Sequence, residues 1–262
     1  MSPLLVDNLI HVAATWAGGA LLVALLHLLE RVSSRQVAHN LGWRGVLVTG
    51  WLGVPVHELS HLAAALLFGH RVVAWKLFDP DPVSGTLGYV RHAYSRRSPW
   101  QLAGGFFIGL APLAAGLLGL AALLCWMAPG ASWLAVARDL ELSAPGLASR
   151  VLEGARRSGG LIWEHRSLLL PVQVYLAVCL TSHMAPSRAD LAGGLWGGLL
   201  VLGLSAGGGA LAAHLGHRLG AGALVLGLLL VLLLLAAVFQ ALYVGLARLV
   251  SRPARGVLLR GE

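Results

Sequence analysis

Two histidines and a glutamate in the segment His57-Glu58-Leu59-Ser60-His61 are the residues whose types and spacing most directly suggest chemistry. On a helix, His57 and His61 lie one turn apart, so both imidazoles project from one face and can bind a single Zn²⁺ ion. Glu58 lies beside that face, where its carboxylate can take a proton from a zinc-bound water. The pattern therefore predicts a hydrolytic metal site with His57 and His61 as ligands and Glu58 as the proton acceptor.

The apolar surroundings of this HExxH segment favour a functional site over a chance pattern. The segment lies inside the apolar run Trp43–Phe68, which is long enough to span a membrane. The alternative is a pair of core histidines on a helix with an unrelated acid beside them. Three unpartnered polar groups are costly to bury in an apolar span, so we expect them to serve a bound metal.

A third ligand must come from elsewhere in the chain, because a catalytic zinc keeps three protein ligands and one open position. Of the eleven Asp and Glu residues, all but Glu58 and Asp190 lie in predicted loops, span edges or tails. Acids at membrane depth are functional by default. Asp190 is therefore the predicted third ligand, and the alternative is that it caps a helix beginning at residue 191.

Together with features further along the chain, these residues resemble the site-2 protease family of intramembrane zinc metalloproteases. A polar, β-rich segment follows the HExxH span, and a later span contains Gly109-Leu110-Ala111-Pro112. A further span is broken at Pro186 and ends in Asp190. The resemblance covers residues 43–200, which would form the metalloprotease core.

The resemblance implies a cofactor, a reaction and a substrate class. In that family two histidines and a distant aspartate hold zinc, a glutamate activates water, and a transmembrane protein substrate is cut within the bilayer. Carried over to this chain, His57, His61 and Asp190 match the ligands and Glu58 matches the base. The implied partners are a transmembrane substrate and the lipid bilayer, and selection of substrate could also involve a regulatory membrane partner.

The later motif departs from the family pattern at two positions. The family has Asn-x-x-Pro followed by Asp-Gly, whereas this chain has His183 at the Asn position, Leu191 after Asp190, and one residue fewer between Pro and Asp. The chain therefore resembles a divergent member. His183 replaces the Asn as a hydrogen-bond donor to substrate, binds the metal itself, or packs between helices; its sequence position leaves these three roles open.

The composition indicates an integral membrane protein. Hydrophobic residues make up 57% of the 262 residues and charged residues 11%, against norms of roughly 45–50% and 25%. This excludes disorder, collagen, a coiled coil and a soluble globule. The net charge of +8 comes from basic residues scattered between apolar runs, which is typical of membrane-flanking Arg rather than of a nucleic-acid-binding surface.

The apolar runs predict an all-α polytopic membrane protein with a single domain over residues 1–262. A span needs about 20 mostly apolar residues, and six runs qualify or nearly do so. The Ala-, Leu- and Arg-rich composition suggests a bacterial inner membrane, and the Arg-rich C-terminal tail favours cytoplasmic termini. The predicted spans are Leu9–Leu29, Trp43–Phe68, Leu102–Met127, Leu168–Ala185, Leu191–His214 and Ala221–Ala247.

Two polar segments interrupt the apolar runs. Between the second and third spans, the β-rich stretches Val72–Phe78 and Thr86–Tyr94 flank a Pro- and Gly-containing turn, which predicts a β-hairpin over residues 72–94. Its edge Leu87–Arg91 is a candidate for pairing with an unwound substrate strand; the alternative is a hairpin that only anchors at the membrane surface. Residues 128–167 form either an interfacial helix or a solvated loop.

These patterns bear on three functions. The first is an intramembrane zinc endopeptidase. The second is a metal-binding membrane protein without protease activity, such as a transporter or a pseudoenzyme; a transporter would have acids and histidines along several spans, and a pseudoenzyme would typically have lost the glutamate. The third is the membrane HExxH class that cleaves prenylated proteins, whose third ligand is a Glu; no Glu after residue 58 lies in a predicted span. The oligomeric state is left open by the sequence.

Overall fold

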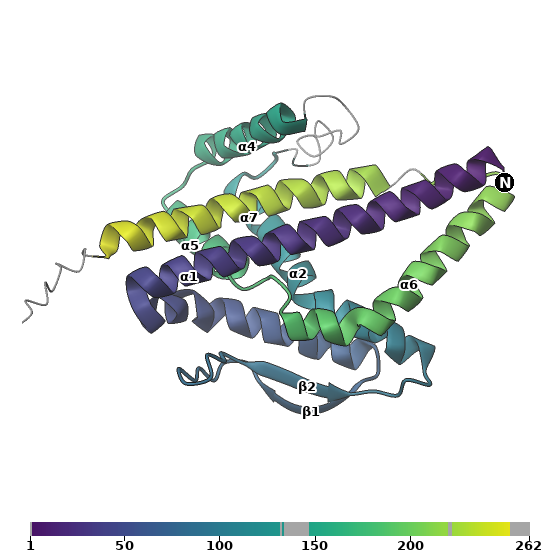
Figure 1. Cartoon of the computed structure of the whole chain (residues 1–262). Coiled ribbons are helices and arrows are strands. Elements are labelled where there is room, and N and C mark those ends of the chain that lie inside the picture. The colour runs from purple at the N-terminus through teal and green to yellow at the C-terminus, as the bar shows by residue number, and fades with distance from the viewer. Residues whose placement is uncertain (1, 132, 134–146, 220–221, 252–262) are drawn as a thin grey trace, which may run out of the picture.

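A computed structural model describes residues 2–131, 133, 147–219 and 222–251. The described chain is mostly helical, with one antiparallel sheet of two strands packed beside the helices (Figure 1). The elements are α1 (Pro3–Leu67), β1 (Arg71–Lys76), β2 (Tyr89–Ala93), α2 (Pro99–Met127), α4 (Leu147–Glu164), α5 (Leu170–Thr181), α6 (Arg188–His214) and α7 (Gly222–Val250).

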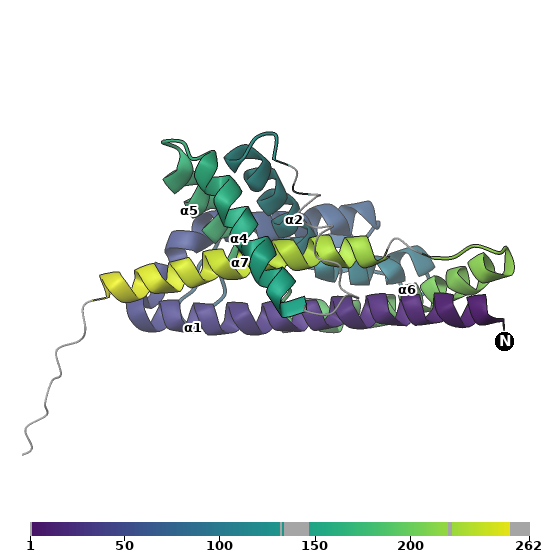
Figure 2. The same cartoon turned by 90° about the horizontal axis from the view of Figure 1, so that it is seen from above.

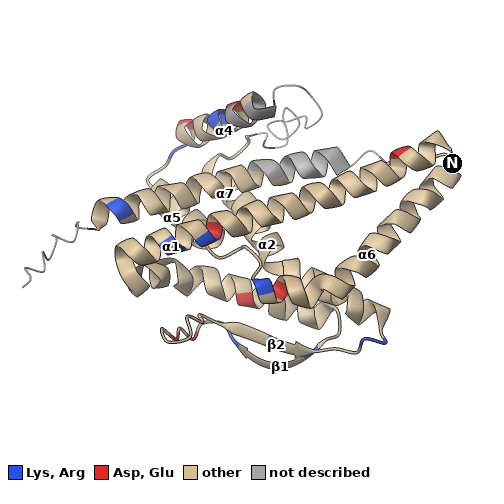
Figure 3. Cartoon of the chain, viewed as in Figure 1, with Lys and Arg blue, Asp and Glu red and all other residues tan. Residues whose placement is uncertain are grey.

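Within the described residues, four helices are long and apolar enough to cross a membrane: α1, α2, α6 and the Leu232–Val250 part of α7. The predicted count of six spans is not confirmed. The first two predicted spans fall on α1, which is interrupted at Gly42 and counts as one of these four helices. The fourth corresponds to α5, whose 12 residues rise only about 18 Å, short of a hydrocarbon core of about 30 Å. Figure 3 agrees with this apolar character, since acidic and basic residues are sparse on the long helices.

Helix α1 consists of two arms joined at Gly42. This glycine has φ 64° and ψ −159°, a conformation that residues with a side chain rarely adopt. The chain reverses there, and the two arms run in opposite directions in Figure 1. The HExxH segment lies on the second arm, which turns back and runs beside the first arm.

The end of the second arm directs the chain into the sheet. Gly69 has φ 68° and its N–H donates to the carbonyl of Leu66, while the N–H of His70 donates to the carbonyl of Ala65 at 2.8 Å. This pair of hydrogen bonds is a Schellman motif, which satisfies the last helical carbonyls. As a result, β1 begins at Arg71, immediately after the helix that carries the predicted ligands.

The predicted hairpin is confirmed, but its strands are shorter than expected. β1 and β2 pair antiparallel from Arg71 opposite Ala93 to Lys76 opposite Tyr89, with an irregularity near Val72. The connecting turn folds on Asp81, whose carboxylate accepts hydrogen bonds from the backbone and side chain of Ser84 and from the backbone of Val83. These bonds lower the pKa of Asp81 and stabilise the turn. Backbone pairing continues up to it, because the N–H of Asp79 donates to the carbonyl of Leu87 and that of Asp81 to the carbonyl of Thr86.

The apolar core lies where α2, α5 and α7 meet. Leu120 and Leu124 of α2, Ala177 of α5 and Ala236 of α7 are almost completely buried there. The side-chain amide of Gln240 donates to the carbonyl of Thr181 at 2.6 Å, which satisfies a backbone group where α5 ends. These contacts fix the end of α5, and with it the segment 182–187 that leads to Asp190.

The polar segment 128–167 contains α4, and residues 134–146 lie outside the described part of the chain. Of the two predicted alternatives, a helix is present from Leu147 to Glu164. On its exposed side Glu153 pairs with Arg156 at 2.9 Å. In Figure 1 α4 lies on the side of α7 opposite the hairpin, and Figure 2 shows it crossing α7.

Candidate metal centre

The structure brings the three predicted ligands together. Nε2 of His57 and Nε2 of His61 are 3.1 Å apart. The Asp190 carboxylate lies 3.3 Å from Nε2 of His61 and 3.9 Å from Nε2 of His57. Because one potential ligand atom from each residue lies within 4.8 Å of the others, the group can hold a metal ion.

Hydrogen bonds on the far side of each imidazole orient both rings. Nδ1 of His57 donates to the carbonyl of His183 at 2.6 Å, and Nδ1 of His61 donates to the carbonyl of Ile108 at 2.9 Å. A carbonyl can only accept, so the proton of each neutral ring is on Nδ1. Both Nε2 lone pairs therefore converge with a carboxylate, an arrangement that suits a cation. Metal-ligating histidines are commonly held in this way.

The carbonyl that orients His61 is available because of Pro112. In a helix the carbonyl of Ile108 would accept from the N–H four residues later, but Pro112 has no N–H. The Gly-Leu-Ala-Pro segment of α2 thus frees an acceptor on the face that meets α1. Next to it, a Cβ atom at Gly109 would lie 2.6 Å from the carbonyl oxygen of Asp190. α2 can approach the third ligand this closely because residue 109 has no side chain.

Asp190 stands in the first turn of α6, just after the break at Pro186. Ser187 is the N-cap: its Oγ accepts from the N–H of Asp190 at 3.1 Å, and its own N–H donates to Oδ2 of Asp190 at 2.7 Å. This is a capping box, with Asp190 at the third helical position. The predicted alternative of Asp190 as the N-cap is wrong in position. Because Oδ1 faces His61, the same carboxylate both caps the helix and completes the metal-ligand group.

Glu58 is buried beside the ligands. No hydrogen-bond partner is found for its carboxylate within the described residues, so this group is available to a bound molecule. It lines a cavity of about 540 Å³ together with His57, His61 and Asp190. The hairpin closes over Glu58, since a Cβ atom at Gly88 would lie 2.9 Å from its Cγ.

The ring of His183 is turned away from the metal-ligand group. Its Nε2 is hydrogen-bonded with Oγ1 of Thr49 at 3.0 Å, and the described group of potential ligands does not include it. Its observed contact with the site is through its backbone carbonyl, which orients His57. The predicted roles of the ring toward substrate stay predictions.

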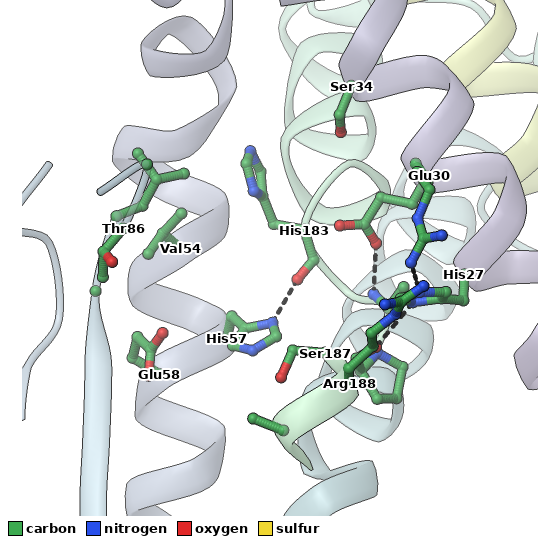
Figure 4. Close-up of a pocket in the computed structure, with 17 residues that line it drawn as sticks. His27, Glu30, Ser34, Val54, His57, Glu58, Thr86, His183, Ser187 and Arg188 are labelled. Atoms are coloured by element: carbon green, nitrogen blue, oxygen red, sulfur yellow. Dashed lines mark hydrogen bonds between the residues drawn. The ribbon is translucent and has the colours of Figure 1, made fainter. Parts of the chain in front are cut away.

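A second cavity, of about 610 Å³, separates the two arms of α1 beside His57 and Glu58. Figure 4 shows Glu30 and His27 on the first arm facing the 183–187 segment. Oε2 of Glu30 accepts from the N–H of Ala185 at 2.9 Å, and Nδ1 of His27 donates to the carbonyl of Pro186 at 3.2 Å. These bonds hold residues 183–187 in place. This segment contains the carbonyl that orients His57, and it leads directly to Asp190.

Sequence reasoning missed these two residues because they stand at the end of a predicted span, where polar groups are ordinary. A signal was nevertheless present. His27 and Glu30 are three residues apart in an apolar run, so they share one helix face. Two polar residues on one helix face at the end of an apolar run can share one polar partner.

Comparison of the chain with protein-family models, with curated proteins and with solved structures finds no match. The functional interpretation therefore depends on the geometry of the site and on the motif residues themselves.

Proposed function

We propose that the protein is an intramembrane zinc metalloendopeptidase, similar to the site-2 proteases, that hydrolyses peptide bonds of transmembrane proteins in a bacterial inner membrane. The observation that carries the proposal is the convergence of two Nε2 atoms and a carboxylate, each oriented by a hydrogen bond on its far side, with the Glu58 carboxylate beside them. Two nitrogen ligands and one oxygen ligand are a donor set typical of catalytic zinc.

A zinc ion bound there supplies Lewis acidity that activates water and polarises a carbonyl group. Glu58 takes the proton of the attacking water on a carboxylate oxygen and passes it to the leaving nitrogen as the C–N bond breaks. Its buried position and its lack of a hydrogen-bond partner within the described residues support this role.

The hairpin is the proposed binding edge for substrate. A transmembrane helix must be unwound before cleavage, and its freed backbone groups then need partners. Tyr89 and Val90 of β2 line the cavity that holds the metal ligands, and β2 pairs with β1 on one side only in the described sheet. An extended substrate placed along the free edge would pass over Gly88 and Glu58.

The second candidate is a metal-binding membrane protein without protease activity. It is favoured by the same ligand group, which by itself requires only a metal. The two functions differ in their need for Glu58. Peptide hydrolysis requires a proton acceptor beside the ligands, whereas metal binding alone does not.

Replacing Glu58 by Gln tests the choice. Glu58→Gln removes the proton acceptor and leaves the ligands in place, so we expect unchanged zinc content and loss of cleavage by at least about 100-fold, the lower range of a general-base contribution. Zinc is measured by elemental analysis of the purified protein, and cleavage with a single-span membrane reporter. His57→Ala, which should lose zinc as well, is the matched control. Wild-type turnover in Glu58→Gln would exclude the protease mechanism.

A further inference from the structure

A pair of hydrogen-bonded histidines adjoins the metal cavity on its hairpin side. His92 of β2 lines the cavity that also contains His57, Glu58 and Asp190. Its Nδ1 lies 2.9 Å from Nδ1 of His70, the buried residue that ends the Schellman motif of α1. The two rings are in contact, with centroids 4.9 Å apart.

The contact between His70 and the start of α2 determines which ring nitrogens of the pair carry protons. Nε2 of His70 is 2.7 Å from the backbone carbonyl of Gln101 at the start of α2. Since the carbonyl can only accept, Nε2 of His70 carries the proton, and Nδ1 of the neutral ring is an acceptor. His92 must then donate from its own Nδ1. In a neutral His92 this leaves Nε2 unprotonated, with a lone pair.

That lone pair has no partner within the described residues, on a side chain that lines the cavity. Desolvation by burial, together with the neighbouring His70 and His61, lowers the pKa of His92, with Asp190 opposing the shift. The neutral ring is therefore the form expected near neutral pH, and it presents an acceptor rather than a donor.

We propose that Nε2 of His92 binds a backbone N–H of an extended peptide substrate in the metal cavity. The inference rests on the proposed function and adds a substrate-binding residue to it. An unpaired acceptor on the wall of this cavity can accept from a bound ligand, and an extended peptide offers a backbone N–H at every residue except proline. The Gln101–His70–His92 chain sets the acceptor before substrate arrives, which reduces the entropy lost on binding.

The protonation pattern is tested first, because its measurement does not depend on activity. In ¹⁵N NMR of histidine-labelled protein, assigned by comparison with His92→Asn, we expect an Nδ1–H ring for His92 and an Nε2–H ring for His70. His70→Phe removes the acceptor and should move the His92 proton toward Nε2. An Nε2–H ring for His92 in the wild type would overturn the proposal, whether or not the protein cleaves peptides.

Binding of two hydroxamates then tests the contact with peptide. A leucine-rich peptide hydroxamate carries backbone N–H groups beside its metal-binding end, and acetohydroxamate lacks a peptide chain. His92→Asn keeps an amide near the position of Nδ1 and loses the acceptor at Nε2, whereas His92→Gln places an acceptor near Nε2. We expect His92→Asn to bind the peptide hydroxamate about 5-fold more weakly, as for loss of one hydrogen bond, and His92→Gln to lose less.

Acetohydroxamate affinity and zinc content should stay at the wild-type level in both variants. Equal weakening for both probes, or loss of zinc in His92→Asn, would mean that His92 acts on the metal, and would overturn the proposal. Unchanged affinity for the peptide hydroxamate would do the same. Failure of the wild type to cleave a membrane reporter, with the expected tautomers and affinities, counts against the protease function alone.

Discussion

At the scale of single residues, each proposed zinc ligand is held by a second contact that fixes its direction. Carbonyl groups orient His57 and His61, and the capping box orients Asp190. The lone pairs of these side chains therefore converge on one point, and the groups that orient the ligands contribute to metal affinity.

Two substitutions separate the metal-binding role of Asp190 from its helix-capping role. Asp190→Ala removes both functions, while Asp190→Asn keeps an oxygen that can accept from Ser187 and loses the negative charge. We expect both variants to lose zinc affinity by more than about 100-fold, because even the outer partners of ligands are worth roughly 10- to 100-fold. Zinc titration with a competing chelator gives the affinities.

His183→Ala is the comparison variant. It keeps the backbone carbonyl that orients His57, so its zinc affinity should remain near wild type while its turnover falls if the ring contacts substrate. A loss of zinc in His183→Ala, with zinc retained in Asp190→Ala, would mean that the ligands are His57, His61 and His183.

At the scale of elements, each orienting carbonyl is one that lacks a helical hydrogen bond. The interruption between α5 and α6 exposes the carbonyl of His183, and Pro112 exposes that of Ile108. Local irregularity in α2 and in the 182–187 segment is thus part of the site, as is typical of broken helices that line polar cavities in membranes.

Pro112→Ala tests this use of the proline. The new N–H at residue 112 can reclaim the carbonyl of Ile108 for the helix and compete with Nδ1 of His61, so we expect zinc affinity to fall by about 10-fold. Helix content by circular dichroism should not decrease. Pro55→Ala alters the proline inside α1. It affects neither of the carbonyls that orient the histidine ligands, so this variant should keep wild-type affinity. Equal affinities in the two variants would contradict the account.

The parts of the site that were predictable are those encoded in short patterns. The one-turn spacing of His57 and His61 predicted them as ligands, and the rarity of acids in apolar runs predicted Asp190 as the third. The hairpin was recognisable from its β-rich stretches, but its strand ends depended on the Asp81 turn. Glu30 and His27 act through contacts with residues 185 and 186, so no local pattern could assign their partners.

At the scale of the whole molecule, the metal-ligand group is assembled from parts that are far apart in the chain. The second arm of α1 brings His57 and His61, the start of α6 brings Asp190, and α2 packs against both. The six-span prediction is not confirmed: the first two predicted spans fall on α1, which counts as one helix, and α5 is too short to cross a membrane. The reversal at Gly42 folds one long helix into two arms, and the second cavity lies between them.

The zinc content of the purified protein directly tests the metal centre. We expect one tightly bound zinc ion per chain in the wild type, matching the single described ligand group, and none in His57→Ala or in Asp190→Ala. Wild-type protein without zinc, or variants that keep it, would contradict a metal centre formed by His57, His61 and Asp190.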